Sequence, residues 1–108
     1  MIHNWKNIDQ DSVNNLANKP DVMLIDVREK EEFLEGHIPQ ALNIPLSEFT
    51  NRVTELNRES RLILICRSGN RSTRACEHLS FLGFNHINNL VGGMLVWNGD
   101  IVEGGQKE

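Results

Sequence analysis

The residue best suited to covalent chemistry is Cys66, which directly follows the apolar run 62–65. A short, continuous apolar run is typical of a strand buried on both faces, as in a parallel sheet covered by helices. Cys66 is therefore expected at the carboxyl end of a parallel strand, where open α/β sheets bind ligands. The loop after it contains Gly69, which permits the positive φ angle that a tight turn usually needs. With a helix expected soon after, the backbone N–H groups of the loop can converge on one point and hold an anion.

A cysteine thiolate at the centre of such a cradle would itself be the stabilised anion. A helix N-terminus and nearby arginines lower a thiol pKa from ~8.5 to between ~3.5 and ~7.5, which produces a nucleophile at neutral pH. Arg67 and Arg71 lie in this loop. The alternative is that Cys66 is a small buried residue that ends a strand. The combination of strand end, glycine-containing loop, two arginines and helix start favours the reactive thiol.

Charge is unevenly distributed along the chain. Its 108 residues carry a net charge of −4, yet residues 61–76 hold four arginines and no carboxylate. A cationic patch on an acidic protein predicts one anion-binding site, whereas the alternative is a solvated helix face. The four residues are Arg61, Arg67, Arg71 and Arg74.

Length and composition limit the class of protein. The chain is predicted to form one domain over residues 1–103 with a frayed tail over 104–108. The N-terminus shows no signal segment and no apolar run is long enough for a membrane span, so a cytoplasmic protein is expected. Two cysteines do not make a disulfide scaffold. The acidic balance and the absence of aromatic residues among the loop arginines argue against nucleic acid, and the cysteines and histidines lack zinc-site spacing.

Apolar and amphipathic stretches alternate along the chain, which predicts an α/β fold with right-handed crossovers. Helices are expected after a cap at Asp9 or Asp11, over 29–35 up to Gly36, after a cap at Ser47, and after a cap at Ser72 or Thr73. Strands are expected over 4–8, 22–25, 41–44 as an edge strand, 62–65 and 85–90, with a helical turn over 94–97.

The segment 66–72 resembles the active-site loop of the rhodanese family, the thiosulfate sulfurtransferases. Two further segments resemble that family's signatures, and the likeness runs in order from about residue 5 to about residue 100. The N-terminal signature is Leu24-Ile25-Asp26-Val27-Arg28 followed by Glu32-Phe33, Gly36-His37-Ile38 and Ala41-x-x-Ile44-Pro45, and the C-terminal one is Gly92-Gly93-Met94 with Trp97.

The resemblance implies a parallel five-stranded sheet with helices on both faces. It also implies that Cys66 takes a sulfur atom from an anionic donor such as thiosulfate and passes it, as a persulfide, to cyanide, a thiol or a protein acceptor. No metal or cofactor is implied. The implied substrate-binding residues are Arg67, Ser68, Gly69, Asn70, Arg71 and Ser72, of which the two arginines would attract the donor.

Some residues and functions are left with two interpretations. Cys76 stands where the family usually has a small residue and is interpreted as a core residue rather than a resolving thiol. Asp26 is expected to be structural, bonded to loop N–H groups or paired with Arg28, and His37 to serve a turn. The rival functions are a phosphatase or arsenate reductase, a non-catalytic binding module and a sulfur relay. Phosphatases of this kind use Cys-x5-Arg, whereas only four residues separate Cys66 from Arg71.

Overall fold

The computed structural model describes residues 4–105. Five strands alternate with helices, in the order that the sequence predicts. The strands are β1 (Trp5–Ile8), β2 (Val22–Asp26), β3 (Ala41–Asn43), β4 (Arg61–Ile65) and β5 (Ile87–Leu90), and the α-helices are α1 (Gln10–Leu16), α2 (Lys30–Glu35), α3 (Phe49–Arg52) and α4 (Asn70–Phe81). Short 3-10 turns η1, η2 and η3 cover Leu46–Glu48, Val53–Glu55 and Gly93–Leu95. Within the described residues, no helix is both long and apolar enough to cross a bilayer.

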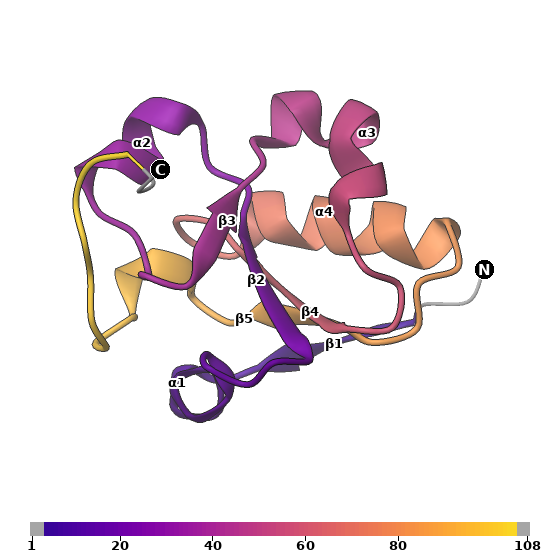
Figure 1. Ribbon diagram of the computed structural model, residues 1–108, viewed down its shortest axis with the longest axis horizontal. Helices are drawn as coiled ribbons and strands as arrows, with labels where there is room; N and C mark the ends of the chain where they lie inside the picture. Colours follow the sequence, from indigo (N-terminus) through magenta and orange to yellow (C-terminus); the bar gives the residue numbers. More distant parts are fainter. Residues whose placement is uncertain (1–3, 106–108) are drawn as a thin grey trace.

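All five strands form one parallel sheet in the order β1-β5-β4-β2-β3 (Figure 1). The two continuous apolar runs of the sequence are β2 and β4, which pair with each other near the centre. In their register Leu24 lies opposite Ile63 and Asp26 opposite Ile65. The short strand β3 lies at one edge, as its length and the following Pro45 predict.

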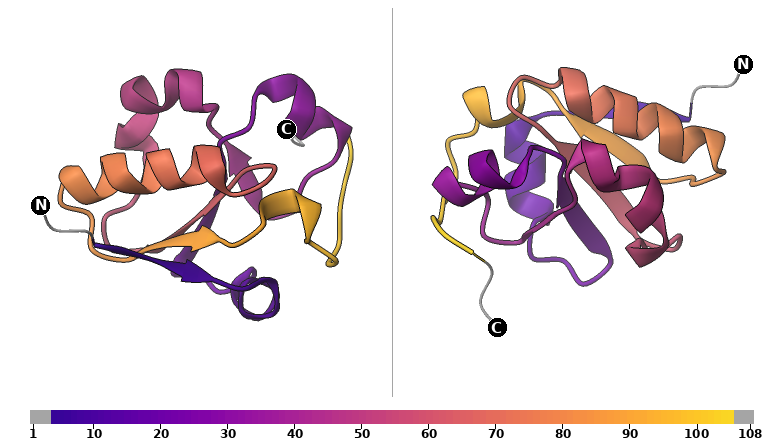
Figure 2. Two further views of the ribbon diagram at one scale, coloured as in Figure 1. Left: turned by 180° about the vertical axis from the view of Figure 1, so that it is seen from behind. Right: turned by 90° about the horizontal axis from the view of Figure 1, so that it is seen from above.

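Helices cover both faces of the sheet, which gives the chain two apolar cores. Alternate residues of β4 point to opposite faces, so Leu62 and Leu64 enter one core and Ile63 and Ile65 the other. Figures 1 and 2 show α1 on the opposite side of the sheet from α3 and α4. The first core is closed by Phe49 of α3 and by Ala75, Cys76 and Leu79 of α4, and the second by Val13 of α1 and Phe33 of α2.

The first two helices begin where the sequence predicts. Asp9 caps α1, and its Oδ1 accepts a hydrogen bond of 2.8 Å from the N–H of Ser12. Helix α2 follows Glu29, which forms a reciprocal capping box with Glu32, and Gly36 ends it.

The other two cap predictions are wrong. The hydroxyl group of Ser47 donates to Glu29, so it caps no helix, and the chain turns through η1 before α3 begins at Phe49. Helix α4 begins at Asn70, two residues before the expected cap at Ser72, because Gly69 adopts a left-handed conformation with φ of 105° and starts the helix earlier. Ser72 therefore lies in the first turn of α4, where its side chain reaches the functional site.

The C-terminal segment returns to α2 (Figure 1). His37 and Val102 form an antiparallel bridge, and the N–H of Gly104 donates to the carbonyl of Leu34 at 2.8 Å. The expected frayed tail thus starts at a residue that is hydrogen-bonded, and its last part, 106–108, lies outside the described residues. The imidazole of His37 is buried and stacks on Phe33, with ring centroids 3.6 Å apart, so it holds this turn in place as the sequence predicts.

Candidate active site

Cys66 directly follows β4 at the carboxyl edge of the sheet, with only 1% of its surface exposed. Its loop lies beside the turn that follows β5 (Figure 1), which holds it by backbone hydrogen bonds. The N–H of Met94 donates to the carbonyl of Cys66 at 2.9 Å, and the N–H of Leu95 to that of Arg67 at 3.0 Å. The backbone of the Cys66 loop is therefore held by β4 on one side and by the turn after β5 on the other.

Gly93, in the turn after β5, lies directly against the backbone of the Cys66 loop. A Cβ atom at this position would collide with the carbonyl groups of Cys66 and Arg67, so no side chain fits there. Its positive φ of 55° adds a second reason for glycine. Gly93 thus allows close backbone approach to the Cys66 loop.

Hydrogen bonds converge on the sulfur of Cys66. The N–H of Gly69 donates to Sγ at 3.0 Å, and the Ser72 hydroxyl lies 3.3 Å from it. Burial raises the pKa of the Cys66 thiol, but hydrogen bonds from the Ser72 side chain and from the backbone N–H groups of Ser72, Gly69 and Ser68 outweigh it, so the net pKa is lowered. Backbone N–H groups of the loop thus donate to the sulfur of Cys66, and their binding of a substrate anion stays a prediction.

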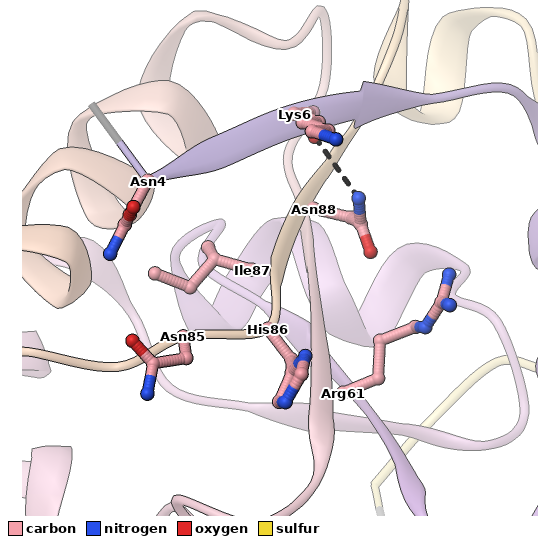
Figure 3. A pocket seen from close by; sticks show the side chains of 7 residues that line it. All are labelled: Asn4, Lys6, Arg61, Asn85, His86, Ile87 and Asn88. Atoms are coloured by element: carbon pink, nitrogen blue, oxygen red, sulfur yellow. Dashed lines mark hydrogen bonds between the residues drawn. The ribbon is translucent and has the colours of Figure 1, made fainter.

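The four arginines do not form the single cationic patch that the sequence predicts. Arg61 begins β4 and Cys66 follows its end, so the two are about 16 Å apart at the strand rise. Figure 3 shows Arg61 instead near His86 and Asn88, among the residues that line a pocket of about 290 Å³ at the start of β4 and β5. Closeness in sequence was misleading here because a strand carries its two ends to opposite edges of the sheet.

Arg71 is paired with a carboxylate. Its two terminal nitrogens donate to both oxygens of Glu32 on α2, at 2.7 and 2.9 Å. Arg67 and Arg74 are exposed, as are Ser68 and Asn70, and Gly69 is buried. Of the two expected donor-attracting arginines, the structure therefore places Arg67 at the loop surface and joins Arg71 to a neighbouring helix.

The carboxylate of Asp26 and the thiol of Cys76 both lie in structural surroundings, as expected. Asp26 is fully buried and accepts hydrogen bonds from the Arg28 side chain and backbone N–H, at 2.8 to 3.1 Å. Cys76 is fully buried in the core beneath α4, and burial raises its pKa to about 12. This supports the core interpretation of Cys76.

Two residues of the site were not predicted. Glu32 was noted only as part of a sequence signature, and its partner Arg71 lies 39 positions away. Asn89 lies on β5, and its Oδ1 faces the hydroxyl group of Ser72. The sequence gives no signal that singles out Asn89, because the neighbouring Asn88 of the same strand is identical in type. In residues 4–105 no group of three or more His, Cys, Asp or Glu side chains could hold a metal ion.

Comparison with known proteins decides the family. Residues 9–100 match the Rhodanese-like domain family. The chain belongs to the rhodanese family.

Relatives of this rhodanese chain include two bacterial sulfurtransferases. It is 41% identical over 80 residues to the putative sulfurtransferase YtwF of Bacillus subtilis, a match covering 74% of this chain and 77% of YtwF. It is 37% identical over 91 residues to a sulfurtransferase of Allochromatium vinosum, covering 83% and 85%. Among solved structures, a rhodanese-related protein from Thermoplasma volcanium has a TM-score of 0.82 and 32% identity, with 90% of this chain and 97% of the other covered.

Proposed function

We propose that this rhodanese moves a sulfane sulfur atom from thiosulfate or a persulfide donor to a thiophilic acceptor, through a persulfide on Cys66. The observation that carries the proposal is the sulfur of Cys66 at the carboxyl edge of the sheet, with hydrogen bonds from Gly69 and Ser72 that favour its thiolate form. A thiolate at neutral pH is a nucleophile without metal or cofactor.

The first half-reaction forms the persulfide. The thiolate of Cys66 attacks the outer sulfur of thiosulfate, a new S–S bond forms, and the S–S bond of thiosulfate breaks with its electron pair leaving on sulfite. The charge stays on the terminal sulfur of the persulfide. The N–H groups of residues 67–72 would hold that anion, because backbone dipoles in a buried loop stabilise charge without reorganising.

The second half-reaction discharges the persulfide. An acceptor such as cyanide or a thiolate attacks the terminal sulfur, and the S–S bond to Cys66 breaks with its electron pair returning to the cysteine. With cyanide the product is thiocyanate, and the enzyme is back in its thiolate form. The cycle is a ping-pong reaction in which Cys66 alone changes covalently.

A protein acceptor is a second candidate for the same step. Leu95 and Val96 are 61% and 46% exposed directly beside the Cys66 loop, and exposed apolar residues at a site entrance favour protein docking. One relative, 42% identical over 76 residues, is the putative sulfur carrier protein YrkF of Bacillus subtilis, of which this chain covers 41%. The free thiols of Cys66 and Cys76 also favour a reducing, cytoplasmic location.

Mass spectrometry of the intact protein tests the persulfide. Thiosulfate should add the mass of one sulfur atom and cyanide should remove it. Cys66→Ala should neither gain the sulfur nor turn over, whereas the matched variant Cys76→Ala should do both. A Cys66→Ala variant that still carries and transfers sulfur would refute the mechanism.

The rival phosphatase function is tested with an aryl phosphate. Four residues between Cys66 and Arg71, rather than five, make a smaller ring of N–H donors, which suits one sulfur atom better than a phosphoryl group. We expect negligible hydrolysis of the aryl phosphate. Efficient hydrolysis that is lost in Cys66→Ala would favour the rival function.

A further inference from the structure

The hydroxyl group of Ser72 has one proton and two acceptors. Its Oγ lies 3.3 Å from Sγ of Cys66 and in a short contact with Oδ1 of Asn89. A serine hydroxyl group can donate only one hydrogen bond at a time. The sulfur and the amide oxygen therefore compete for the same proton.

The competing acceptor is held in place by the sheet. Asn89 lies on β5 between β1 and β4, and its Nδ2 donates to Oδ1 of Asn7 on β1 at 3.0 Å. With its Nδ2 directed to Asn7, the Asn89 amide presents its oxygen to Ser72. Ser72 is fully buried and Asn89 is 4% exposed, so bulk water does not replace either partner. Buried polar groups in such a network are expensive to leave unpaired, which makes the competition consequential.

We propose that Asn89 is a positioning residue that competes with the sulfur of Cys66 for the Ser72 proton and thereby sets the acidity of that thiol. While Cys66 is protonated, its sulfur is a weak acceptor and the Ser72 hydroxyl group donates to Asn89. When Cys66 loses its proton, the charged sulfur becomes the stronger acceptor and the hydroxyl group turns toward it. Ionisation of Cys66 therefore costs one hydrogen bond to Asn89 and gains one to sulfur. Besides the proton that Cys66 releases, only the direction of the Ser72 O–H bond changes in this step.

The other charged and titratable groups around Cys66 are independent of this competition. Arg71 on α4 interacts with the charge of Cys66 and is paired with Glu32 on α2. Cys76, also on α4, stays neutral near pH 7 because burial raises its pKa to about 12. Asp26 on β2 is paired with Arg28, and Arg67 follows Cys66 in the loop. A substitution at Asn89 that keeps the fold leaves each of these groups in place.

The test is a titration of the Cys66 thiolate by its ultraviolet absorbance, in a Cys76→Ala background that leaves a single thiol. Asn89→Leu removes the competing acceptor at nearly constant volume, so the Ser72 proton is free for the sulfur. We expect the titration midpoint to move to lower pH, with about fivefold more thiolate below the midpoint, which is the effect of one ordinary hydrogen bond. If Asn89→Leu fails to fold, Asn89→Val makes the same removal with a side chain that suits a strand.

Two controls separate competition from a merely structural effect. In a Ser72→Ala background, Asn89→Leu should leave the midpoint unmoved, because no proton remains to compete for. Asn88→Leu, at the preceding residue of β5, whose side chain points to the opposite face, should also leave the midpoint unmoved. The proposal is overturned if Asn89→Leu leaves the midpoint unchanged or raises it, or if it shifts the midpoint equally without the Ser72 hydroxyl group.

This inference rests on the proposed function only in its choice of thiol. The titration measures proton loss from Cys66 and involves no sulfur transfer. A protein that titrates as expected but forms no persulfide would refute the proposed function and leave the role of Asn89 standing. A protein that forms the persulfide but whose titration midpoint does not respond to Asn89→Leu would refute the role of Asn89 alone.

Discussion

Replacing Glu32 with glutamine keeps the length of the side chain but removes its charge, so it leaves the guanidinium group of Arg71 in place without an ionic partner. Both nitrogens of Arg71 donate to Glu32, at 2.7 and 2.9 Å, and the pair connects α2 to the first turn of α4. The hydrogen bonds from Arg71 lower the pKa of Glu32 from 4.5 to about 2, against the opposing effect of burial.

The magnitude follows from that pKa and from the exposure of the pair. A drop in pKa from 4.5 to about 2 would correspond to about 3 kcal/mol in an unscreened site. Because the two side chains are 32% and 33% exposed, solvent screening reduces the expected contribution to about 1 kcal/mol. We therefore expect Glu32→Gln to lower the free energy of unfolding by about 1 kcal/mol at neutral pH.

The sign of the pH dependence is set by the lowered pKa of Glu32. A carboxyl group with a lower pKa in the folded state stabilises the fold above its unfolded pKa, and this contribution disappears as the pH falls through the folded pKa. The difference in stability between the natural protein and Glu32→Gln should therefore be full above about pH 5, decline from there, and vanish below about pH 2. Urea unfolding followed by tryptophan fluorescence at a series of pH values measures it, with the exposed neighbour substitution Glu31→Gln as the matched control.

The same variant tests whether the positive charge of Arg71 attracts thiosulfate. An unpaired Arg71 attracts a dianion more strongly than a paired one, so Glu32→Gln should lower the KM for thiosulfate about twofold to fivefold, the range of an exposed charge interaction. Glu31→Gln should change it less. A folded Glu32→Gln protein with an unchanged or raised KM would refute the view that Glu32 neutralises Arg71 at the site.

Three further predictions concern residues around the loop. Arg67→Ala should raise the KM for thiosulfate in steady-state assays, and the rise should shrink with added salt because Arg67 is exposed and charges are screened over ~10 Å at 0.1 M. Cys76→Ala should retain most sulfur transfer to cyanide, and iodoacetamide should leave Cys76 unmodified in the native protein, because burial raises the pKa of that thiol to about 12; alkylation of native Cys76 would contradict its core position. Arg28→Met leaves the buried carboxylate of Asp26 without its ionic partner, so urea unfolding should show a loss of about 3–5 kcal/mol; a loss below 1 kcal/mol would contradict a tightly coupled pair.

The two central strands could be predicted from the sequence because strands buried on both faces have a recognisable local pattern of apolar residues. The runs that became β2 and β4 are continuously apolar, and only strands covered on both faces need that pattern. Helix starts were predicted less well, because several residue types compete for each cap. Helix α4 begins after Gly69 because of the left-handed conformation of that residue. The hydroxyl group of Ser72 contacts Cys66 and Asn89 instead of capping the helix.

The site divides in the same way between local and distant contacts. Cys66 and its loop are contiguous, so their geometry follows from a strand end, a glycine and a helix start. Glu32 lies 39 positions from Arg71, and Asn89 lies 17 positions from Ser72, and no spacing rule connects such pairs. The acid-free stretch 61–76 was misleading for the same reason, since Glu32 from another helix pairs with Arg71 and β4 separates Arg61 from the loop.

The acidity of Cys66 and the recruitment of an anionic donor rest on different groups, so salt should separate them. The thiolate is favoured by hydrogen bonds from Gly69 and Ser72, both buried, and buried dipoles are little affected by dissolved ions. Arg67 is exposed, and Arg71 is already paired, so the proposed attraction of thiosulfate would depend on charges that salt screens. Raising the ionic strength should therefore raise the KM for thiosulfate while the titration midpoint of Cys66 stays in place. An acidic protein can favour a thiolate in this way, because the Ser72 hydroxyl group and backbone N–H donors, rather than net positive charge, lower the pKa of Cys66.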